Sequence, residues 1–346
     1  MVVIVLNKNT KAAISAVASY LPVKILDNEQ LAEEFPEWSV DKIFEKTGIY
    51  SRHIASEDET CSVMAVNAAR ALMDENNIEP DSIDYILLCT QSPDYVLPTT
   101  ACIVQHELGI PTSCGALDFN LGCSGYVYGL SLAKGLIESN QSKRILLITS
   151  EIYSKYINKK DKSVRTLFGD AATATLVEGV ESEIDRIGSF AFGTDGQGEK
   201  NLIVPHGGSK NPISPESQIE IKDASGNIRA PKNLFMNGAE ILTFTLKTVP
   251  KSIKAILAKA DLTEEQVDKV IFHQANKFML EKLRKKTGFT EKQFLTSYEK
   301  YGNTVSSTIP LGIEKALKAN QLNKGDKLLI CGFGVGYSWS GAIITW

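Results

Sequence analysis

Residues 118 to 128 place a cysteine between two glycines, where a strand pattern gives way to a helical one. The segment reads D-F-N-L-G-C-S-G-Y-V-Y, and its cysteine is Cys123. A thiol at the N-terminus of a helix meets the positive end of the helix dipole, which favours the thiolate. The flanking glycines let backbone N–H groups approach whatever the sulfur attacks. The segment therefore predicts a nucleophile, with simple packing in the core as the competing interpretation.

Three further segments carry groups that could assist such a thiol. His273 follows the apolar run Val270 to Phe272, and catalytic groups often occupy the ends of strands in α/β proteins. Asn303 lies between a glycine and small polar residues, where a turn or a helix cap is the structural alternative. The segment Gly334 to Gly336 follows a strand, and its glycines permit close backbone approach. A thiol, a base or donor, an amide and a glycine-lined loop together fit acyl-thioester chemistry.

The composition is typical of a globular protein and excludes several classes. The chain has 346 residues, of which 43% are hydrophobic and 23% charged, and its net charge is -4. Without a long basic block, nucleic acid is not expected as a partner. The six cysteines show no CxxC spacing, so we expect neither a metal site nor a disulfide scaffold.

The sequence shows no pattern of export or membrane insertion. The apolar run Val2 to Leu6 is too short for a signal-peptide core. No run approaches the roughly 18 apolar residues of a membrane span, so we expect a cytoplasmic protein without one.

Apolar runs of strand length alternate with helical patterns along the chain. Residues 83–89, 116–121 and 144–149 are predicted strands, whereas residues 99–108 and 124–139 are predicted helices. Buried strands separated by helices indicate an α/β fold whose sheets are covered on both faces.

Two pairs of segments repeat at nearly the same offset. Residues 76–86 resemble residues 260–270, and residues 143–148 resemble residues 326–331. Such matches indicate an internally duplicated core, with convergence of common strand patterns as the alternative. The expected halves are residues 1–190, which carry the cysteine, and residues 191–346, which carry the histidine and the asparagine.

Together these segments resemble a β-ketoacyl-acyl-carrier-protein synthase III, a condensing enzyme of the thiolase superfamily. The similarity spans nearly the whole chain and includes residues 118–128, Phe168 to Ala172, His273 to Asn276 and Tyr301 to Thr304. The resemblance implies a thiolase-like duplicated αβαβα five-layer core that forms a homodimer. It also implies an acyltransferase of fatty-acid biosynthesis with no bound cofactor. Its substrates would be acyl-CoA and malonyl-acyl carrier protein.

The roles implied by this resemblance fall on individual residues. Cys123 would be acylated by a starter thioester. His273 and Asn303 would donate hydrogen bonds to the malonyl thioester oxygen, which gains negative charge as carbon dioxide leaves. The backbone N–H groups of Cys123 and Gly336 would hold the second oxyanion. The residues expected to shape the substrate pocket are Leu97, Phe168 and Val335.

Several positions depart from the pattern of the family. Val335 stands within what is usually a glycine triplet, and Leu97 replaces a phenylalanine that the dimer partner contributes. Phe278 replaces a carrier-binding arginine, with Lys277 beside it. Trp38 lies further upstream than the family's cofactor-contacting tryptophan, so we assign it no role. These changes bear on the choice of substrate more than on the chemistry.

Carrier proteins are acidic, so the site that docks one needs basic side chains. Lys247, Lys251 and Lys254 have the spacing that places side chains on one face of a helix. We expect Lys251 and Lys254, with Lys277 and Phe278, to dock the carrier. A solvated helix face is the alternative.

Other functions stay open at this point. The same fold and acyl-Cys123 could serve a specialised lipid, polyketide or surface-glycan pathway with another acceptor. A catalytically silent partner subunit would typically lack the cysteine, which is present here. A papain-like protease has the same chain order of Cys, His and Asn, but its cysteine should lie near the mature N-terminus.

Overall fold

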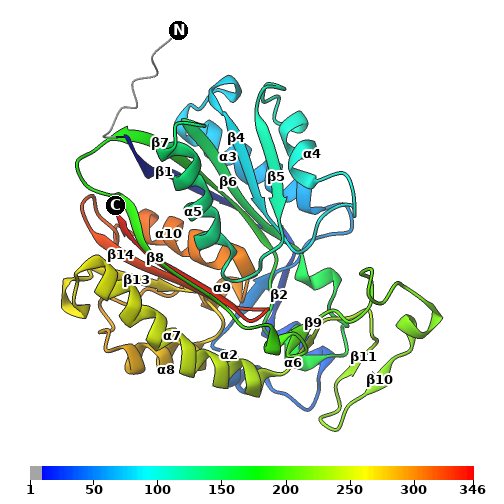
Figure 1. Cartoon of the computed structure of the whole chain (residues 1–346). Helices are drawn as coiled ribbons and strands as arrows, with labels where there is room; N and C mark the ends of the chain where they lie inside the picture. Colours follow the sequence, from blue (N-terminus) through cyan, green and yellow to red (C-terminus); the bar gives the residue numbers. More distant parts are fainter. Residues whose placement is uncertain (1–9) are drawn as a thin grey trace.

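The computed structural model describes residues 10–346, in which two large β-sheets have helices between and outside them (Figure 1). The strand order is β1-β7-β6-β4-β5 in the first sheet and β13-β14-β15-β8 in the second. The first sheet comprises β1 (Thr10–Tyr20), β4 (Tyr85–Cys89), β5 (Gly115–Phe119), β6 (Arg144–Glu151) and β7 (Ala171–Glu181). The second comprises β8 (Ile187–Thr194), β13 (Lys269–Phe272), β14 (Lys327–Gly334) and β15 (Ser338–Thr345).

The long helices form three layers around the two sheets. α3 and α4 cover the outer face of the first sheet, α7 covers the outer face of the second with α8 beside it, and α5 and α10 lie between the sheets (Figure 1). These five layers confirm the expected αβαβα core. The helices are α3 (Cys61–Asn76), α4 (Thr100–Glu107), α5 (Gly125–Glu138), α7 (Gly238–Ala260), α8 (Lys277–Thr287) and α10 (Thr308–Lys318).

The central helices account for the strongly apolar strands. Leu130 of α5 and Ile313 of α10 belong to one buried cluster with Ile145 of the first sheet and Ile330 of the second. Because each sheet is covered on both faces, its inner strands need apolar side chains on both sides.

The sequence repeat corresponds to a structural repeat. β4 pairs in parallel with β6, and β13 pairs in parallel with β14. Asp84 and Asp268 hold matching positions just before β4 and β13. The Asp84 carboxylate accepts a hydrogen bond from the N–H of Arg144 at 2.9 Å, and that of Asp268 accepts one from the N–H of Lys327 at 2.8 Å. Each sheet therefore aligns its parallel pair by the same contact. The division expected after residue 190 falls inside β8, which pairs with β15.

Shorter helices and strands complete the fold. They include α1 (Asn28–Glu34), α2 (Val40–Thr47), α6 (Lys162–Arg165) and α9 (Tyr298–Tyr301). The short strands form three pairs, β2 (Ile25–Asp27) with β3 (Ser51–His53), β12 (Phe235–Met236) with β9 (Leu202–Ile203), and β10 (Ile221–Lys222) with β11 (Ile228–Arg229).

Within residues 10–346, none of the helices combines the length and the apolar character needed to cross a membrane. The apolar run Val2 to Leu6, which is expected to be too short for a signal-peptide core, lies outside the described residues.

Candidate active site

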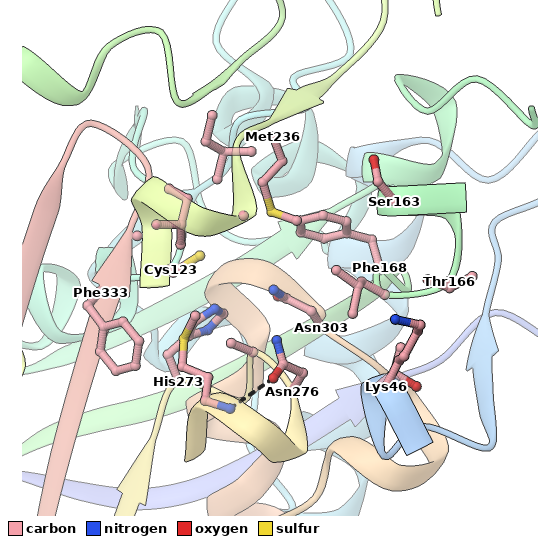
Figure 2. Close-up of a pocket in the computed structure, with 18 of the residues that line it drawn as sticks. Lys46, Cys123, Ser163, Thr166, Phe168, Met236, His273, Asn276, Asn303 and Phe333 are labelled. Carbon is pink, nitrogen blue, oxygen red and sulfur yellow. Dashed lines mark hydrogen bonds between the residues drawn. The ribbon is translucent and has the colours of Figure 1, made fainter. Parts of the chain in front are cut away.

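A cavity of about 270 Å³ lies where the two halves of the fold meet. Cys123, His273 and Asn303 all line it, although they come from three separate loops (Figure 2). Cys123 precedes α5, His273 follows β13, and Asn303 follows α9. The apolar part of the lining includes Phe168, Leu202, Met236, Ile241, Met279 and Phe333.

Strand β14 covers the cysteine. Cys123 is buried, and the turn before α5 is closed by a hydrogen bond from the N–H of Gly125 to the carbonyl of Gly122 at 2.8 Å. A Cβ on Gly332 would collide with the Cys123 carbonyl oxygen, and a Cβ on Gly334 would lie 2.9 Å from the Cys123 sulfur. Glycine at these two positions lets the strand pass directly over the thiol.

Burial reverses the expected acidity of this thiol. Removal from water raises the pKa of Cys123 to about 12, and the charge of Glu151 acts in the same direction. Hydrogen bonds from backbone N–H groups of Cys123 and Val335 oppose the rise. Desolvation therefore opposes the stabilisation of the thiolate that is expected from the helix N-terminus. The thiol is protonated at neutral pH and needs a proton acceptor during catalysis.

His273 is a buried, neutral imidazole. Burial lowers its pKa to about 3, so the ring carries one proton at neutral pH. Its Nδ1 lies 2.8 Å from Oγ1 of Thr308, and the same hydroxyl lies 3.0 Å from the carbonyl of Val305. If the hydroxyl donates to Val305, it accepts from Nδ1–H and leaves Nε2 as a free base. If the hydroxyl donates to Nδ1, the ring proton sits on Nε2.

The Asn303 side chain is oriented by its own loop. Its Oδ1 accepts a hydrogen bond from the N–H of Val305 at 2.9 Å, so the amide NH₂ is the group left for the cavity. The backbone of Asn303 also pairs with Leu167 and Gly169, its N–H donating to the Leu167 carbonyl and its carbonyl accepting from the Gly169 N–H. The neighbouring Val305 has φ of 56°, a left-handed conformation that is uncommon for a β-branched residue. These hydrogen bonds fix the loop, and the Asn303 amide NH₂ is left as a donor for the cavity.

The glycine-rich turn after β14 supplies a backbone donor to the sulfur. The N–H that favours the Cys123 thiolate belongs to Val335, the residue before the expected Gly336. Gly336 itself has φ of 134°, which only glycine adopts readily, and so lets the chain turn away directly after Val335.

The three predicted pocket residues have different environments. Phe168 lines the cavity, whereas Val335 is not among the residues of the described lining. Val335 lies beside the Cys123 turn, since its Cγ1 is 2.7 Å from the position that a Cβ on Gly122 would take. Leu97 is 80% exposed on its own chain and does not reach the cavity of that chain.

The predicted docking residues separate into two places. Lys251 and Lys254 are exposed on α7, and Lys251 borders a shallow hollow with Phe192 and Trp339. Lys277 and Phe278 begin α8, directly after the cavity residue Asn276, and both are exposed.

The mouth of the cavity contains side chains to which no role was predicted from the sequence. Trp38 and Lys46 line it, and the Nζ atoms of Lys42 and Lys46 lie 5.5 and 5.4 Å from the centre of the Trp38 ring. The Nζ of Lys277 lies 5.7 Å from the ring of Phe44. The regular spacing of Trp38, Lys42 and Lys46 at four-residue intervals was the available signal. The mouth therefore combines aromatic rings with positive charge.

Among residues 10–346, no three His, Cys, Asp or Glu side chains are grouped so that they could hold a metal ion.

Comparison with known sequences and structures identifies the family. Sequence models described as 3-oxoacyl-[acyl-carrier-protein] synthase III and as the C-terminal part of that enzyme match residues 117–196 and 257–346. A β-ketoacyl-[acyl-carrier-protein] synthase III of Caldanaerobacter subterraneus subsp. tengcongensis is 36% identical over 341 residues, which cover 97% of this chain and 98% of the relative.

Solved structures agree with this similarity. A crystal structure of a 3-oxoacyl-(acyl-carrier-protein) synthase III is 50% identical, with a TM-score of 0.96 over 97% of this chain and all of the other. The priming β-ketosynthase of the R1128 polyketide pathway is 28% identical, with a TM-score of 0.85 over 97% of each chain. The shared fold, the near-complete coverage and the level of identity show that the chain belongs to the β-ketoacyl-acyl-carrier-protein synthase III family of condensing acyltransferases.

Proposed function

We propose that this protein joins a short acyl group, carried on Cys123, to the two-carbon unit that malonyl-acyl carrier protein supplies on losing carbon dioxide. The observation that carries the proposal is the convergence of a thiol, a neutral imidazole and an outward-directed amide on one buried cavity of this family's fold. Covalent catalysis of this kind splits a difficult condensation into two easier steps.

The first step loads the enzyme. The Cys123 sulfur attacks the carbonyl carbon of an acyl-CoA, and its proton passes to His273 Nε2. The bond between the acyl carbon and the CoA sulfur breaks, and the leaving thiolate takes the proton from His273. This step requires Nε2 without a proton, which is the tautomer in which Nδ1–H donates to Thr308. Because burial raises the pKa of the thiol, transferring its proton during attack avoids forming a free thiolate.

The second step forms the new carbon–carbon bond. The malonyl carboxylate leaves as carbon dioxide, and the electron pair of the broken bond moves into the thioester enolate. Asn303 NH₂ and His273 Nε2–H donate hydrogen bonds to the enolate oxygen. The enolate carbon then attacks the acyl carbon, and Cys123 departs and is reprotonated from solvent. The donating tautomer of His273 is the one in which the Thr308 hydroxyl points to Nδ1.

Both steps pass through a tetrahedral oxyanion on the acyl carbon. The backbone N–H groups of Cys123 and Val335 favour negative charge at the sulfur. The oxyanion forms on the acyl carbon bonded to that sulfur, so it lies close to the same two donors. We therefore assign the second oxyanion site to Cys123 and Val335, in place of the Gly336 expected from the sequence.

The assembly and the carrier site are further parts of the proposal. Tyr95, Val96 and Leu97 are 61%, 98% and 80% exposed, and such a run of apolar side chains favours a homodimer interface. The acidic carrier is proposed to dock near Lys277 and Phe278 at the cavity mouth, with Lys251 and Lys254 as a second basic patch. The cytoplasmic location expected from the sequence stays a prediction.

A specialised pathway is the second candidate. The observation that favours it is the similarity to the priming synthase of a polyketide pathway, at 28% identity along the chain. In that case the loading step is unchanged, and only the acceptor of the acyl group differs.

Reconstituted turnover tests the proposal. With acetyl-CoA and malonyl-acyl carrier protein, we expect one carbon dioxide for each acetoacetyl-carrier formed, and no acetoacetyl-carrier from Cys123→Ala within the detection limit. Loading of Cys123 without any condensed product would reject this acceptor and favour the specialised pathway.

A second experiment tests carrier docking. Lys277→Glu should slow carrier-dependent turnover, and the loss of rate should become smaller as the salt concentration rises. Lys251→Glu/Lys254→Glu measured alongside shows which patch the carrier uses.

A further inference from the structure

Glu151, the last residue of β6, is a fully buried carboxyl group that takes no part in the two proposed steps. Its Oε2 accepts hydrogen bonds from the N–H of Gln91 at 3.1 Å and from the hydroxyl of Ser92 at 3.3 Å, and its Oε1 accepts one from the hydroxyl of Ser306 at 2.9 Å. Within residues 10–346, none of the ion pairs includes Glu151. Burial therefore raises its pKa to about 8.

This carboxyl group lies behind the turn that carries the thiol. Gln91, whose N–H binds Glu151, has its Oε1 2.6 Å from the place that a Cβ on Gly122 would take, and Gly122 directly precedes Cys123. A negative charge on Glu151 raises the pKa of the Cys123 thiol, second in effect only to burial. Glu151 thus influences the charge that the sulfur can carry without touching the cavity, since it is not among the residues of the described lining.

The contacts of Glu151 suit both of its protonation states. The backbone N–H of Gln91 can only donate, so Oε2 has to remain an acceptor and the proton belongs on Oε1. There the Ser306 hydroxyl can accept from the protonated group and can donate to the ionised one. Ionisation therefore adds a charge without requiring a rearrangement. A glutamine at this position reproduces the protonated form, with its oxygen toward Gln91 and its NH₂ toward Ser306.

The other titratable groups that face Glu151 come from the helices, strands and loops around it. They are Cys61, Cys89, Cys123, Tyr153, Tyr156 and Asp170. Burial raises the pKa of each of these thiols and phenols, so all of them still hold their protons at pH 8. Burial raises the pKa of Asp170 to about 6, so Asp170 is ionised first and opposes a second negative charge. Among these groups, Glu151 is therefore the one that gains charge near pH 8.

We propose that Glu151 is a positioning residue for the loading step: in its protonated form it permits negative charge to develop at Cys123, and as a carboxylate it opposes that charge and slows loading. Loading should consequently be suppressed in alkaline solution. The inference rests on the proposed function where it concerns acyl transfer, whereas the effect on the thiol itself is independent of the substrate.

The experiment compares Glu151→Gln with the wild-type protein from about pH 6.5 to about pH 9.5, with two measurements at Cys123. One is the initial rate of acetyl gain from acetyl-CoA, and the other is the rate of alkylation by iodoacetamide, both located on Cys123 by peptide mass mapping. The ratio of variant to wild-type rate cancels the general rise of thiolate with pH. It should be close to one at the acidic end and about tenfold at the alkaline end, because one pKa unit changes the thiolate fraction tenfold. The midpoint should lie near pH 8.

Two further variants make the comparison specific. Ser306→Ala removes a donor that favours the carboxylate, so it should move the wild-type midpoint to higher pH. Glu59→Gln is the matched control, because Glu59 is also buried and accepts from the hydroxyls of Ser56 and Tyr20, each at 2.7 Å. Its rates should follow the wild-type profile at every pH.

A melting curve checks that Glu151→Gln is folded. The raised pKa means that the native protein binds this proton more tightly than the unfolded chain, so the contribution of Glu151 to stability falls as the pH rises from 4.5 to about 8. The variant should therefore melt no lower than the wild-type protein at about pH 9.

The outcomes separate this inference from the function on which it rests. A ratio that does not change with pH in either measurement, whatever its level, overturns the role of Glu151 and leaves the acyl-Cys123 mechanism standing. If Glu151→Gln does not fold, an unchanged midpoint in Ser306→Ala has the same meaning. If the alkylation ratio rises as expected but neither protein gains acetyl on Cys123, the proposed function is wrong and the effect of Glu151 on the thiol stands.

Discussion

Replacing Asn303 by alanine should slow decarboxylation far more than loading. Asn303 Oδ1 is bound to the N–H of Val305, so the NH₂ group is what the cavity loses as an oxyanion donor. Removing one such donor typically lowers the rate by about 10²- to 10³-fold, or about 2.7–4 kcal/mol of transition-state stabilisation. The same change leaves the buried N–H of Val305 without its partner, which we expect to cost about 1–3 kcal/mol of folding stability.

The assay for this variant separates the two effects. Loading is read as acyl mass on the intact protein, and decarboxylation as carbon dioxide released from malonyl-acyl carrier protein by preloaded enzyme. Asn276→Ala is the matched control, because Asn276 also lines the cavity and its Oδ1 also accepts a backbone N–H, that of Met279, at 2.9 Å. Loading should persist in both variants, with the large fall in decarboxylation confined to Asn303→Ala. Decarboxylation within about threefold of wild type, or an equal fall in the control, would refute the donor role.

Three other predictions concern the same site. Because burial raises the pKa of Cys123 to about 12, its alkylation by iodoacetamide should rise steadily from pH 7 to pH 9, and a plateau below pH 7 would show a stabilised thiolate. Gly334→Ala should abolish loading, because its methyl group would lie 2.9 Å from the Cys123 sulfur. Gly135→Ala, whose methyl would meet nothing within 4 Å, should load normally, and equal loading by both would be inconsistent with the close strand crossing. Thr308→Val removes the hydroxyl that orients His273 and should slow both half-reactions by about tenfold, measured as kcat across pH. An unchanged kcat would exclude the proposed change of His273 between its two tautomers.

Much of the fold and the membership of the cavity could be predicted from local pattern. Asp84 and Asp268 occur at matching places before two apolar runs, and the structure gives them the same contact with a neighbouring strand. Cys123, His273 and Asn303 each lie where a strand, turn or helix pattern changes, and such junctions meet at one end of an α/β sheet. Their presence on one cavity follows from that topology, whereas their catalytic roles stay predictions.

The features that escaped prediction depend on contacts distant in sequence. The acidity of Cys123 depends on β14 passing over it, a contact between residues about 200 positions apart that no local pattern reveals. The donor N–H falls on Val335 because the backbone at Gly336 turns with a positive φ. The spacing of Trp38 and Lys46 indicates one face of a helix, but the position of that face at the cavity mouth depends on the packing of α2 against α8, which spacing does not reveal.

The central claim is that Cys123 alone carries the acyl group, and intact-protein mass spectrometry after exposure to acetyl-CoA tests it most directly. Cys89 and Cys331 are also buried, and burial raises the pKa of each thiol, but neither is part of the described cavity lining. One acetyl adduct is expected on the wild-type protein, on Cys89→Ala and on Cys331→Ala, and none on Cys123→Ala. An adduct that persists in Cys123→Ala would contradict the account.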